Sequence, residues 1–486
     1  MKEKIIRDLV HGYIEIDEKI CKIIDHPSFQ RLKNICQLTA HHLYPSANHT
    51  RFEHSLGVMH LADQFFKRLK EDVEIKKCKK VTKFEITKMH INLKLAALLH
   101  DVGHGPFSHL GEQFYDNKII LKQIDKIDKS IGKVLIDGSK HEFMSCFIIL
   151  HNFRKLLDLE YPDIIDYELI CRIITGNTYD GKKLWYYDIL VNIVNSDSID
   201  VDKLDYLMRD NHMCGYVAPK INYDRLLLSL IINTREKKLS IKPVGLSSLV
   251  SFIDSRDMLY LWVYNHHTVV YTDFLYKIMV KHLRSKENKK SKYKIKRIMK
   301  KWFSPKNIAE NYLSDNDIKV LLNNEYINTK SKFLKSEFSK IVLSQIIERK
   351  FLKPIWKTIY DYNTFMHKYF QDDRTRERIE TDINRTIDDE PIYIKQIVKC
   401  IINKTGISHG EIFLIQRSNK FYSMSENSKF YININSKSDK FLDNIFPERK
   451  FENNYSKIAF YIFTKETHKK DVQKAFIKIM NNTEYK

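Results

Sequence analysis

The sequence has little of what a secreted or membrane protein needs. Its 486 residues include seven cysteines, an odd number with no C-x-x-C pair, so we expect neither a disulfide scaffold nor a zinc ribbon. The first residues, MKEKIIRDLVHGY, carry charge where a signal peptide has an apolar core. No segment approaches the roughly 18–20 uninterrupted apolar residues of a membrane span. We therefore expect no membrane partner, reduced thiols and an intracellular location, cytoplasmic or nuclear.

The composition is that of a globular protein with a strongly basic balance. Hydrophobic residues make up 43% and charged residues 29% of the chain, which is ample material for a core. Because single cores seldom exceed roughly 250–300 residues, we expect at least two lobes. The net charge of +21 favours acidic partners such as nucleotides or nucleic acid, although a generally lysine-rich surface gives the same count. The charge is concentrated in Lys281 to Lys301, which hold eleven basic residues and one acidic residue.

The spacing of apolar residues predicts a mainly α fold. From about residue 18 to residue 280 they recur three and four positions apart. Asp17 and Thr50 are expected to cap helices, and Pro27 to open one. In the helix after Thr50, His54 shares a face with apolar residues and is expected to point inward. Residues 118–140 mix Ile with Lys and Asp and are expected to form an insertion, either mobile or a small hairpin.

The carboxy-terminal part has a different pattern of apolar and polar residues. The segments EIFLIQRSN, KFYININSK and KIAFYIFTK alternate apolar and polar residues and predict a small sheet. A final helix, THKKDVQKAFIKIM, is expected to pack on it. We therefore expect a helical core in residues 1–285 and a smaller α+β lobe in residues 286–486, with the basic run at their junction.

Three segments bring together residues that suit a metal ion. In LLHDVGHGPFSH, Gly103, Gly105 and Pro106 break a helix just after His100 and Asp101. His54 comes from RFEHSLG, and Asp202 from SIDVDKLDYLMRD, a helix with several ionisable groups on one face. Taken singly, His54 also fits a position in the hydrophobic core, and the helix that carries Asp202 also fits a solvent-exposed acidic face.

Together these residues predict a metal-assisted reaction. His54, His100, Asp101 and Asp202 offer nitrogen and carboxylate ligands for a divalent ion, with Fe, Mn, Zn and Mg all admissible. Positions left open for water or a phosphate oxygen favour hydrolysis of a phosphate ester.

The order H…HD…D within these segments resembles the HD-domain metal-dependent phosphohydrolases. More narrowly, it is similar to the deoxynucleoside triphosphate triphosphohydrolases of the SAMHD1 type, from about Ile5 to Leu283. The resemblance implies an HD-domain helical core, a dNTP substrate and release of deoxynucleoside and inorganic triphosphate. It also implies a homo-oligomer, dimer or tetramer, with a regulatory or oligomerisation role for the carboxy-terminal lobe.

The resemblance also assigns site residues. Metal ligands are implied at His54, His100, Asp101 and Asp202. Catalytic roles are implied for His104, His109, Glu112, His141 and Glu142, with His109 as the general acid and Glu112 orienting it. Substrate contacts are implied for Gln37, Leu38, Arg51, Lys203, Tyr206, Asp210, His267 and Tyr271. Of these, Arg51 and Lys203 match phosphate contacts. Tyr206 and Asp210 match groups that hold the sugar and its 3′-hydroxyl. Gln37 and Leu38 match residues that crowd the 2′ position, and Tyr271 with His267 matches the nucleobase side.

The sequence departs from this family at the far end of the substrate. Val263 stands where the family has an arginine that grips the triphosphate, so Arg256 or a lysine of the insertion is expected to replace it. This departure keeps open a phosphodiesterase or nucleotidase that acts on another nucleotide.

Two further partners are implied or left open. Asp25, Gln30 and Lys33 match a GTP or dGTP effector site, with Lys33 in place of a forked arginine; a helix cap and a surface pair is the other interpretation. From another class of protein, the charge and the basic run support binding of single-stranded nucleic acid, with the HD site secondary.

Overall fold

A computed structural model describes residues 4–71, 81–113, 115–179, 185–216, 220–233, 238–285, 304–327, 337–387, 390–416, 431–433, 439–441 and 458–485. Two compact units divide the chain. Unit 1 comprises Met1–Val263, Lys289–Ile318 and Met424–Phe451, and unit 2 comprises Tyr264–Asn288, Lys319–Ser423 and Glu452–Lys486. The predicted boundary after residue 285 differs from this division, and the roles assigned to the two lobes stay predictions.

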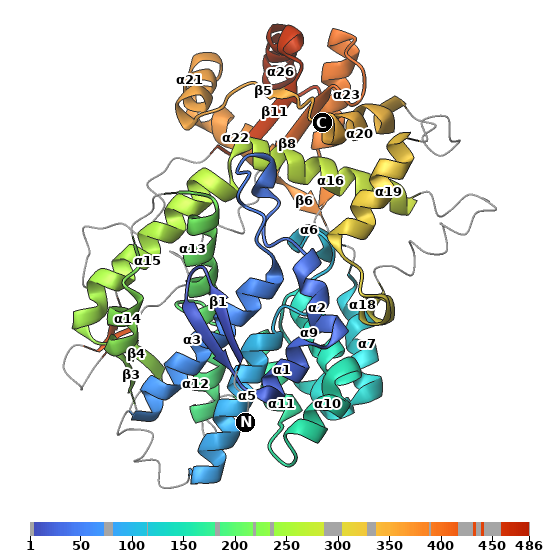
Figure 1. The fold of residues 1–486 in the computed structure, drawn as a ribbon. Helices are drawn as coiled ribbons and strands as arrows, with labels where there is room; N and C mark the ends of the chain where they lie inside the picture. Colours follow the sequence, from blue (N-terminus) through green and yellow to red (C-terminus); the bar gives the residue numbers. More distant parts are fainter. Residues whose placement is uncertain are drawn as a thin grey trace. The chain divides into compact units, whose positions relative to one another are not determined.

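Unit 1 is mainly helical (Figure 1). Its helices are α1 (Glu18–Ile24), α2 (Pro27–Gln30), α3 (Arg51–Glu71), α5 (Lys83–Leu99), α6 (His109–Glu112), α7 (Asn117–Ile127), α8 (Lys129–Val134), α9 (Lys140–Ile148), α10 (Arg154–Glu160), α11 (Tyr167–Thr175), α12 (Trp185–Val194), α13 (Val201–Met213), α14 (Tyr223–Ser229), α15 (Leu246–Leu259) and α18 (Pro305–Asn311). Its strands are β1 (Lys4–Asp8), β2 (Gly12–Ile16), β3 (Leu230–Asn233), β4 (Lys238–Ile241), β9 (Tyr431–Asn433) and β10 (Asp439–Phe441).

Unit 2 combines helices with a small sheet. Its helices are α16 (His267–Ser285), α20 (Glu337–Ile347), α21 (Ile359–Tyr369), α22 (Asp373–Asn384), α23 (Ile394–Thr405) and α26 (Lys469–Asn482), and α19 (Asp315–Ile327) runs from unit 1 into it. Its strands are β5 (Lys353–Pro354), β6 (Thr386–Ile387), β7 (Glu390–Pro391), β8 (Ile412–Gln416) and β11 (Phe460–Thr464). The expected mainly α fold with a smaller α+β part is thus confirmed.

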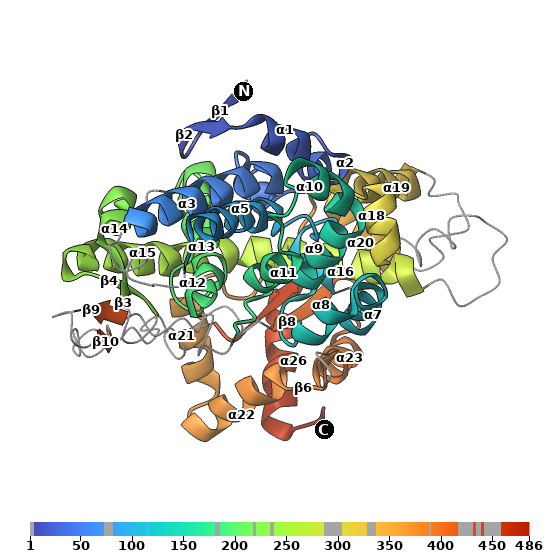
Figure 2. The same ribbon diagram turned by 90° about the horizontal axis from the view of Figure 1, so that it is seen from below.

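The predicted helix starts in unit 1 are confirmed. The Ile20 amide donates to Asp17 Oδ1 at 2.9 Å, and the Phe52 amide donates to Thr50 Oγ1 at 3.3 Å. Helix α3 packs along α5 and α13, and Figure 2 shows α3 and α5 running side by side. His54 lies in this buried layer with no exposed surface. The central helices therefore carry two of the predicted ligand segments into the core.

Most of residues 118–140 are helical, in α7 and α8, so the hairpin alternative is wrong. Asp116 accepts from the amide of Lys118 at the start of α7, and Asp128 accepts from the amide of Ser130 at the start of α8. Ile120, Ile124 and Ile131 are buried. Two aspartate caps and a helical apolar period account for the structure, and the mixed composition concealed both.

The carboxy-terminal sheet is confirmed in part. Strand β11 pairs antiparallel with both β8 and β5, and all five β11 residues are buried. The predicted final helix is α26, whose apolar face is also buried. The segment KFYININSK was wrongly assigned to this sheet, because its strand β9 pairs with β4 in unit 1 through Ile241 and Ile432. Beyond Ser285, the basic run lies outside the described residues.

Candidate active site

Four predicted ligands converge from three segments of unit 1. His54 lies in α3, His100 and Asp101 follow α5, and Asp202 lies in the first turn of α13. The Nε2 atom of His54 is 2.9 Å from Asp202 Oδ1 and 3.6 Å from Asp101 Oδ2. The Nε2 atom of His100 is 3.7 Å from Asp202 Oδ1 and 3.4 Å from Asp101 Oδ1. The structure therefore brings the whole predicted ligand set together.

Hydrogen bonds on the far side of both imidazoles orient them toward this point. His54 donates from Nδ1 to Asp205 Oδ2 at 2.8 Å, and His100 donates from Nδ1 to the Ala97 carbonyl at 2.8 Å. Both Nε2 atoms are buried and face the Asp101 and Asp202 carboxylates, and each would offer its lone pair to a bound cation. Histidines held in this way are typical metal ligands. The arrangement fits a divalent cation, the cofactor expected from the sequence.

The pKa shifts of the histidines and carboxylates also fit a bound cation. Burial lowers the pKa of His54, but hydrogen bonds to Asp202 and Asp205 outweigh it and raise the pKa to about 10. Burial raises the pKa of Asp202, but His100 and His54 hold it below its usual range. Asp202 and Asp205 thus keep a positive charge between them at His54, and a bound metal ion would supply that charge in place of the proton.

Arg51 lies beside the ligand set and contacts Asp101 and Ser108. Its Nη1 lies 2.6 Å from Asp101 Oδ2, and its Nε donates to Ser108 Oγ at 2.9 Å. Burial raises the pKa of Asp101, but the charge of Arg51 first and of His100 next holds it well below its usual range. Arg51 is only 4% exposed, so its guanidinium is held by Asp101 and Ser108, and its contact with phosphate stays a prediction.

The loop after Asp101 is held in place from two sides. Arg31 is buried and donates through Nη2 to the carbonyls of Val102 and His104, both at 2.7 Å. A Cβ on Gly103 would lie 2.2 Å from the His141 carbonyl and 2.3 Å from the Ser145 amide nitrogen. Glycine is therefore required at position 103 for the loop to approach α9, which carries His141.

Three histidines surround one carboxylate beside the metal ligands. Glu112 Oε1 is 2.5 Å from His109 Nδ1, 3.0 Å from His141 Nδ1 and 3.6 Å from His104 Nδ1. The ring of His104 stacks on that of His141 with centroids 4.0 Å apart. Donor atoms of all four residues lie within 4.8 Å of one another, a spacing that also suits a cation, yet hydrogen bonding to Glu112 accounts for the short contacts.

The members of this cluster are in different protonation states. Burial lowers the pKa of His104 far below its usual range, and the charge of Arg51 adds to the effect. Burial also lowers the pKa of His141, but the Glu112 carboxylate outweighs it and raises the pKa to about 9. The side chain of His109 is 60% exposed, in contrast to the buried His104. Only His109 is therefore open to an incoming group.

Glu142 has a structural role at the start of α9. Its carboxylate accepts from the Ser139 amide at 2.6 Å in a capping box, and Asn195 Nδ2 donates to it at 3.1 Å. A catalytic role for Glu142 stays a prediction.

Two of the predicted sugar-side residues are joined by a histidine that the sequence reading did not single out. His49 Nε2 is 2.7 Å from Asp210 Oδ1, and the His49 carbonyl accepts from the Gln37 amide at 3.0 Å. The Gln37 side-chain oxygen is buried without a hydrogen-bond partner in the described part of the chain. Leu38 and Tyr206 are half-buried. The bond to His49 fixes the carboxylate predicted to bind the 3′-hydroxyl.

The remaining predicted residues have other surroundings. Lys203 Nζ donates to the Ser196 carbonyl at 2.6 Å and pairs with Asp200. Val263 has no exposed surface, whereas the guanidinium of Arg256 lies over the Tyr260 ring and its charge acts on Tyr206. Arg256 is thus the cation found near a predicted sugar-side residue.

The predicted nucleobase residues belong to unit 2. Tyr271 is 1% exposed, stacks on Phe463 and donates its hydroxyl to Gln345. Burial lowers the pKa of the half-buried His267 to about 4. Their contact with a nucleobase stays a prediction.

The predicted effector residues lie at the end of α1 and beyond. Asp25 is exposed, and its Oδ2 lies 3.9 Å from Lys4 Nζ. The side-chain Nε2 of Gln30 donates to the Ile24 carbonyl at 2.8 Å. Lys33 Nζ lies over the Phe52 ring. These contacts match the helix-cap and surface-pair interpretation, and an effector there stays a prediction.

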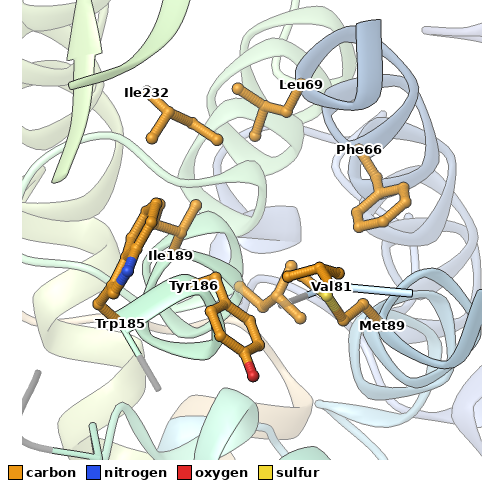
Figure 3. A pocket seen from close by; sticks show the side chains of 9 residues that line it. Phe66, Leu69, Val81, Met89, Trp185, Tyr186, Ile189 and Ile232 are labelled. Carbon is orange, nitrogen blue, oxygen red and sulfur yellow. The ribbon is translucent and has the colours of Figure 1, made fainter. Parts of the chain in front are cut away.

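An apolar hollow lies away from these residues. Its lining includes Phe66, Met89, Trp185 and Tyr186, from α3, α5 and α12 (Figure 3). No carboxylate, imidazole or cation is among the described residues that line it. We therefore place the chemistry at the histidine and carboxylate clusters.

Comparison with known proteins agrees with this arrangement. Residues 51–184 match the model of the HD domain family. A protein of Dictyostelium discoideum named a deoxynucleoside triphosphate triphosphohydrolase SAMHD1 homolog is 35% identical over 44% of this chain. The human deoxynucleoside triphosphate triphosphohydrolase SAMHD1 is 32% identical over 54%. The chain spans 37% and 42% of the length of these two relatives.

A solved structure supports the fold over a longer stretch. A hypothetical protein from Aquifex aeolicus superposes with a TM-score of 0.64 and 23% identity, covering 98% of this chain and all of that one. The described residues include no helix long and apolar enough to span a membrane. With its four predicted ligands assembled and residues 51–184 matching the HD domain family, the chain resembles the metal-dependent phosphohydrolases of the SAMHD1 type.

Proposed function

We propose that this protein hydrolyses deoxynucleoside triphosphates to deoxynucleoside and inorganic triphosphate. The observation that carries the proposal is the adjacency of two clusters through Asp101. Its Oδ1 is 3.4 Å from His100 Nε2 in the ligand set and 3.2 Å from His104 Nε2 in the second cluster. A phosphorus centre between them would have a metal on one side and a proton donor on the other.

The metal and the protein would divide the work. A divalent ion held by His54, His100, Asp101 and Asp202 would supply Lewis acidity to activate water and polarise the α-phosphate. Arg51 would bind a non-bridging oxygen and stabilise charge that develops there during attack. Because Asp101 and Ser108 already fix its guanidinium, little reorganisation is needed on substrate binding.

His109 would complete the reaction at the leaving group. Water would attack the α-phosphorus and lose a proton to solvent, the bond to the 5′-oxygen would break, and the deoxynucleoside would leave as its 5′-alkoxide from the inorganic triphosphate. His109 Nε2 would give its proton to that oxygen, while Nδ1 stays bonded to Glu112. The exposure of its ring suits this role better than the buried ring of His104.

The sugar would be selected by a rigid pair of polar groups. Asp210, held by His49, would face the 3′-hydroxyl, and Gln37, with its unpaired buried oxygen, would face the 2′ side of the sugar. Leu38 beside them would leave no room for a 2′-hydroxyl.

Val263 keeps a second hydrolytic function open. A buried valine cannot grip a terminal phosphate, and this favours a phosphodiesterase or nucleotidase with a different substrate. Arg256, or a lysine of residues 118–140, is the cation we propose for the triphosphate tail. Activation by GTP or dGTP at Asp25, Gln30 and Lys33, and assembly into a dimer or tetramer, belong to the same proposal.

One assay separates these functions. The protein is incubated with each dNTP, with and without GTP, under Mg²⁺ or Mn²⁺, and the products are resolved by chromatography. Deoxynucleoside and triphosphate are the expected products. Monophosphate with pyrophosphate, or turnover of other nucleotides alone, would favour the second function. Salt-sensitive binding of single-stranded nucleic acid without any turnover would instead support a binding protein.

A further inference from the structure

Asp205 lies behind the metal site and accepts four hydrogen bonds. Its Oδ2 accepts from His54 Nδ1 at 2.8 Å and from Arg209 Nε at 2.9 Å. Its Oδ1 accepts from Arg209 Nη2 at 2.9 Å and from His11 Nε2 at 2.6 Å. An ionised carboxylate has about four lone-pair sites, so every site of this one is filled. The orientation of Asp205, and through it that of His54, is therefore fully determined.

The β1–β2 hairpin supplies part of this network from the amino-terminal end of the chain. Figure 2 shows the hairpin beside α3, where β2 packs. The side chain of His11 is 5% exposed, and that of Asp205 has no exposed surface. The same hairpin supplies Asp8, whose Oδ2 accepts from Arg209 Nη1 at 2.8 Å. Asp205 is thus bound by the hairpin both directly and through Arg209.

The hairpin turn is built to direct His11 inward. Asp8 Oδ1 accepts from the amides of Val10 and His11 at 2.8 and 2.9 Å. Gly12 follows with φ at +73°, a conformation that favours glycine and allows strand β2 to return after a three-residue turn. Since one carboxylate closes the turn and also binds Arg209, the turn and the network are a single unit.

Helix α3 makes room for the network. Gly57 lies in its interior, where glycine usually destabilises a helix. A Cβ at this position would lie 1.8 Å from Asp205 Oδ1 and 2.6 Å from Arg209 Nη2. The carboxylate therefore occupies the space that any other side chain at position 57 would fill.

We propose that His11 is a positioning residue of the metal centre and that the hairpin Lys4–Ile16 forms its outer wall. His11 fixes Asp205, Asp205 fixes the Nδ1–H form of His54, and His54 then presents Nε2 to the cation. Without the His11 donor, Asp205 gains freedom to turn and the lone pair of His54 is no longer held in place. The proposal concerns metal binding and holds for any substrate.

A matched pair of variants tests it on the full chain. His11→Leu replaces the imidazole with an apolar side chain that has no hydrogen-bond donor. His11→Gln places an amide N–H near the former position of Nε2. His60→Leu is the control, because its ring lies 5.4 Å from that of His11 and shares the packing. The readouts are metal affinity by chelator competition, the absorption spectrum of the Co²⁺-loaded protein and the thermal unfolding midpoint.

We expect His11→Leu to weaken metal affinity about 10- to 100-fold and to change the Co²⁺ spectrum, as is typical when a metal ligand loses its hydrogen-bonded support. His11→Gln should restore both to within a few-fold, and His60→Leu should leave both unchanged. Equal metal affinity and equal spectra in His11→Leu and the unaltered protein would overturn the proposal. So would equal loss in His11→Leu and His11→Gln, because the donor would then have no special role.

Discussion

Replacing Gly57 with alanine should destabilise the protein, although alanine is the better helix former. In an unobstructed helix interior the change stabilises by roughly 0.5–1 kcal/mol. Here the new Cβ would lie 1.8 Å from Asp205 Oδ1, so the carboxylate must leave its place between His54 and Arg209. Breaking a buried ion pair costs roughly 3–5 kcal/mol. The expected net loss is therefore about 2–4 kcal/mol.

The assay is a double-mutant cycle measured by urea unfolding. Gly57→Ala, Asp205→Ala and the double variant are compared with the unaltered protein. If the steric conflict with Asp205 causes the loss, Gly57→Ala should cost much less once the carboxylate is gone, because only the end of the Arg209 side chain must then move, and the coupling should be about 3 kcal/mol. Metal affinity should fall in both single variants.

Two results would refute this reasoning. The first is a stability of Gly57→Ala equal to or above that of the unaltered protein, which would show that helix propensity outweighs the conflict. The second is an equal loss from Gly57→Ala with and without Asp205, which would place its cause elsewhere in α3.

Three further changes test the other side chains of the site. His109→Gln should lower kcat for the dNTP reaction by about 10²–10⁴ with little change in KM, as expected for loss of a general acid; an unchanged kcat in product-release assays would contradict that role. His49→Ala should raise KM for dNTPs about 10-fold by freeing Asp210, and leave KM for 2′,3′-dideoxy analogues unaltered; an equal rise for both would contradict the 3′-hydroxyl contact. Burial lowers the pKa of His141, but Glu112 raises it from 6.5 to about 9, so its stabilisation is complete below pH 6.5 and lost as the pH rises through 9. Unfolding free energies should therefore fall across this window in the unaltered protein and less so in His141→Gln, and equal slopes would contradict the pairing.

The metal ligands were predictable from sequence because their positions follow from local rules. A helix interrupted by glycines leaves His100 and Asp101 at its end, and helical periodicity turns His54 inward. The loop between them is where glycine is required, since Gly103 lets the backbone reach α9. Short-range patterns therefore predicted that the side chains of His54, His100 and Asp101 converge on one point.

The residues behind the ligands were not predictable in the same way. His11 and His49 follow no periodic pattern, and each meets its partner across more than 150 positions of sequence. Asp205 and Arg209 gave a partial signal, because two buried ionisable groups on one helical face need compensation. The pattern indicates that these groups need a hydrogen-bond partner, but it does not identify the residue. The partner His11 is seen only in the folded structure.

The same limit explains the errors in the smaller elements. Strand β9 was assigned to the carboxy-terminal sheet because alternation predicts a strand and says nothing about its neighbour. Its partner β4 lies nearly 200 positions earlier in the sequence. In residues 118–140 the mixed polar pattern suggested a hairpin, and the capping aspartates were the evidence for helices.

The two histidine ligands are oriented by different parts of the chain, and this affects how metal binding could be altered. The His100 ring is oriented by the Ala97 carbonyl of its own helix, α5. His54 is oriented through Asp205, which depends on a second helix and on the β1–β2 hairpin. Metal affinity should therefore respond to anything that displaces the hairpin, and it should do so through His54 rather than through His100. A ligand bound at the outer surface of the hairpin would then alter catalysis without touching the substrate.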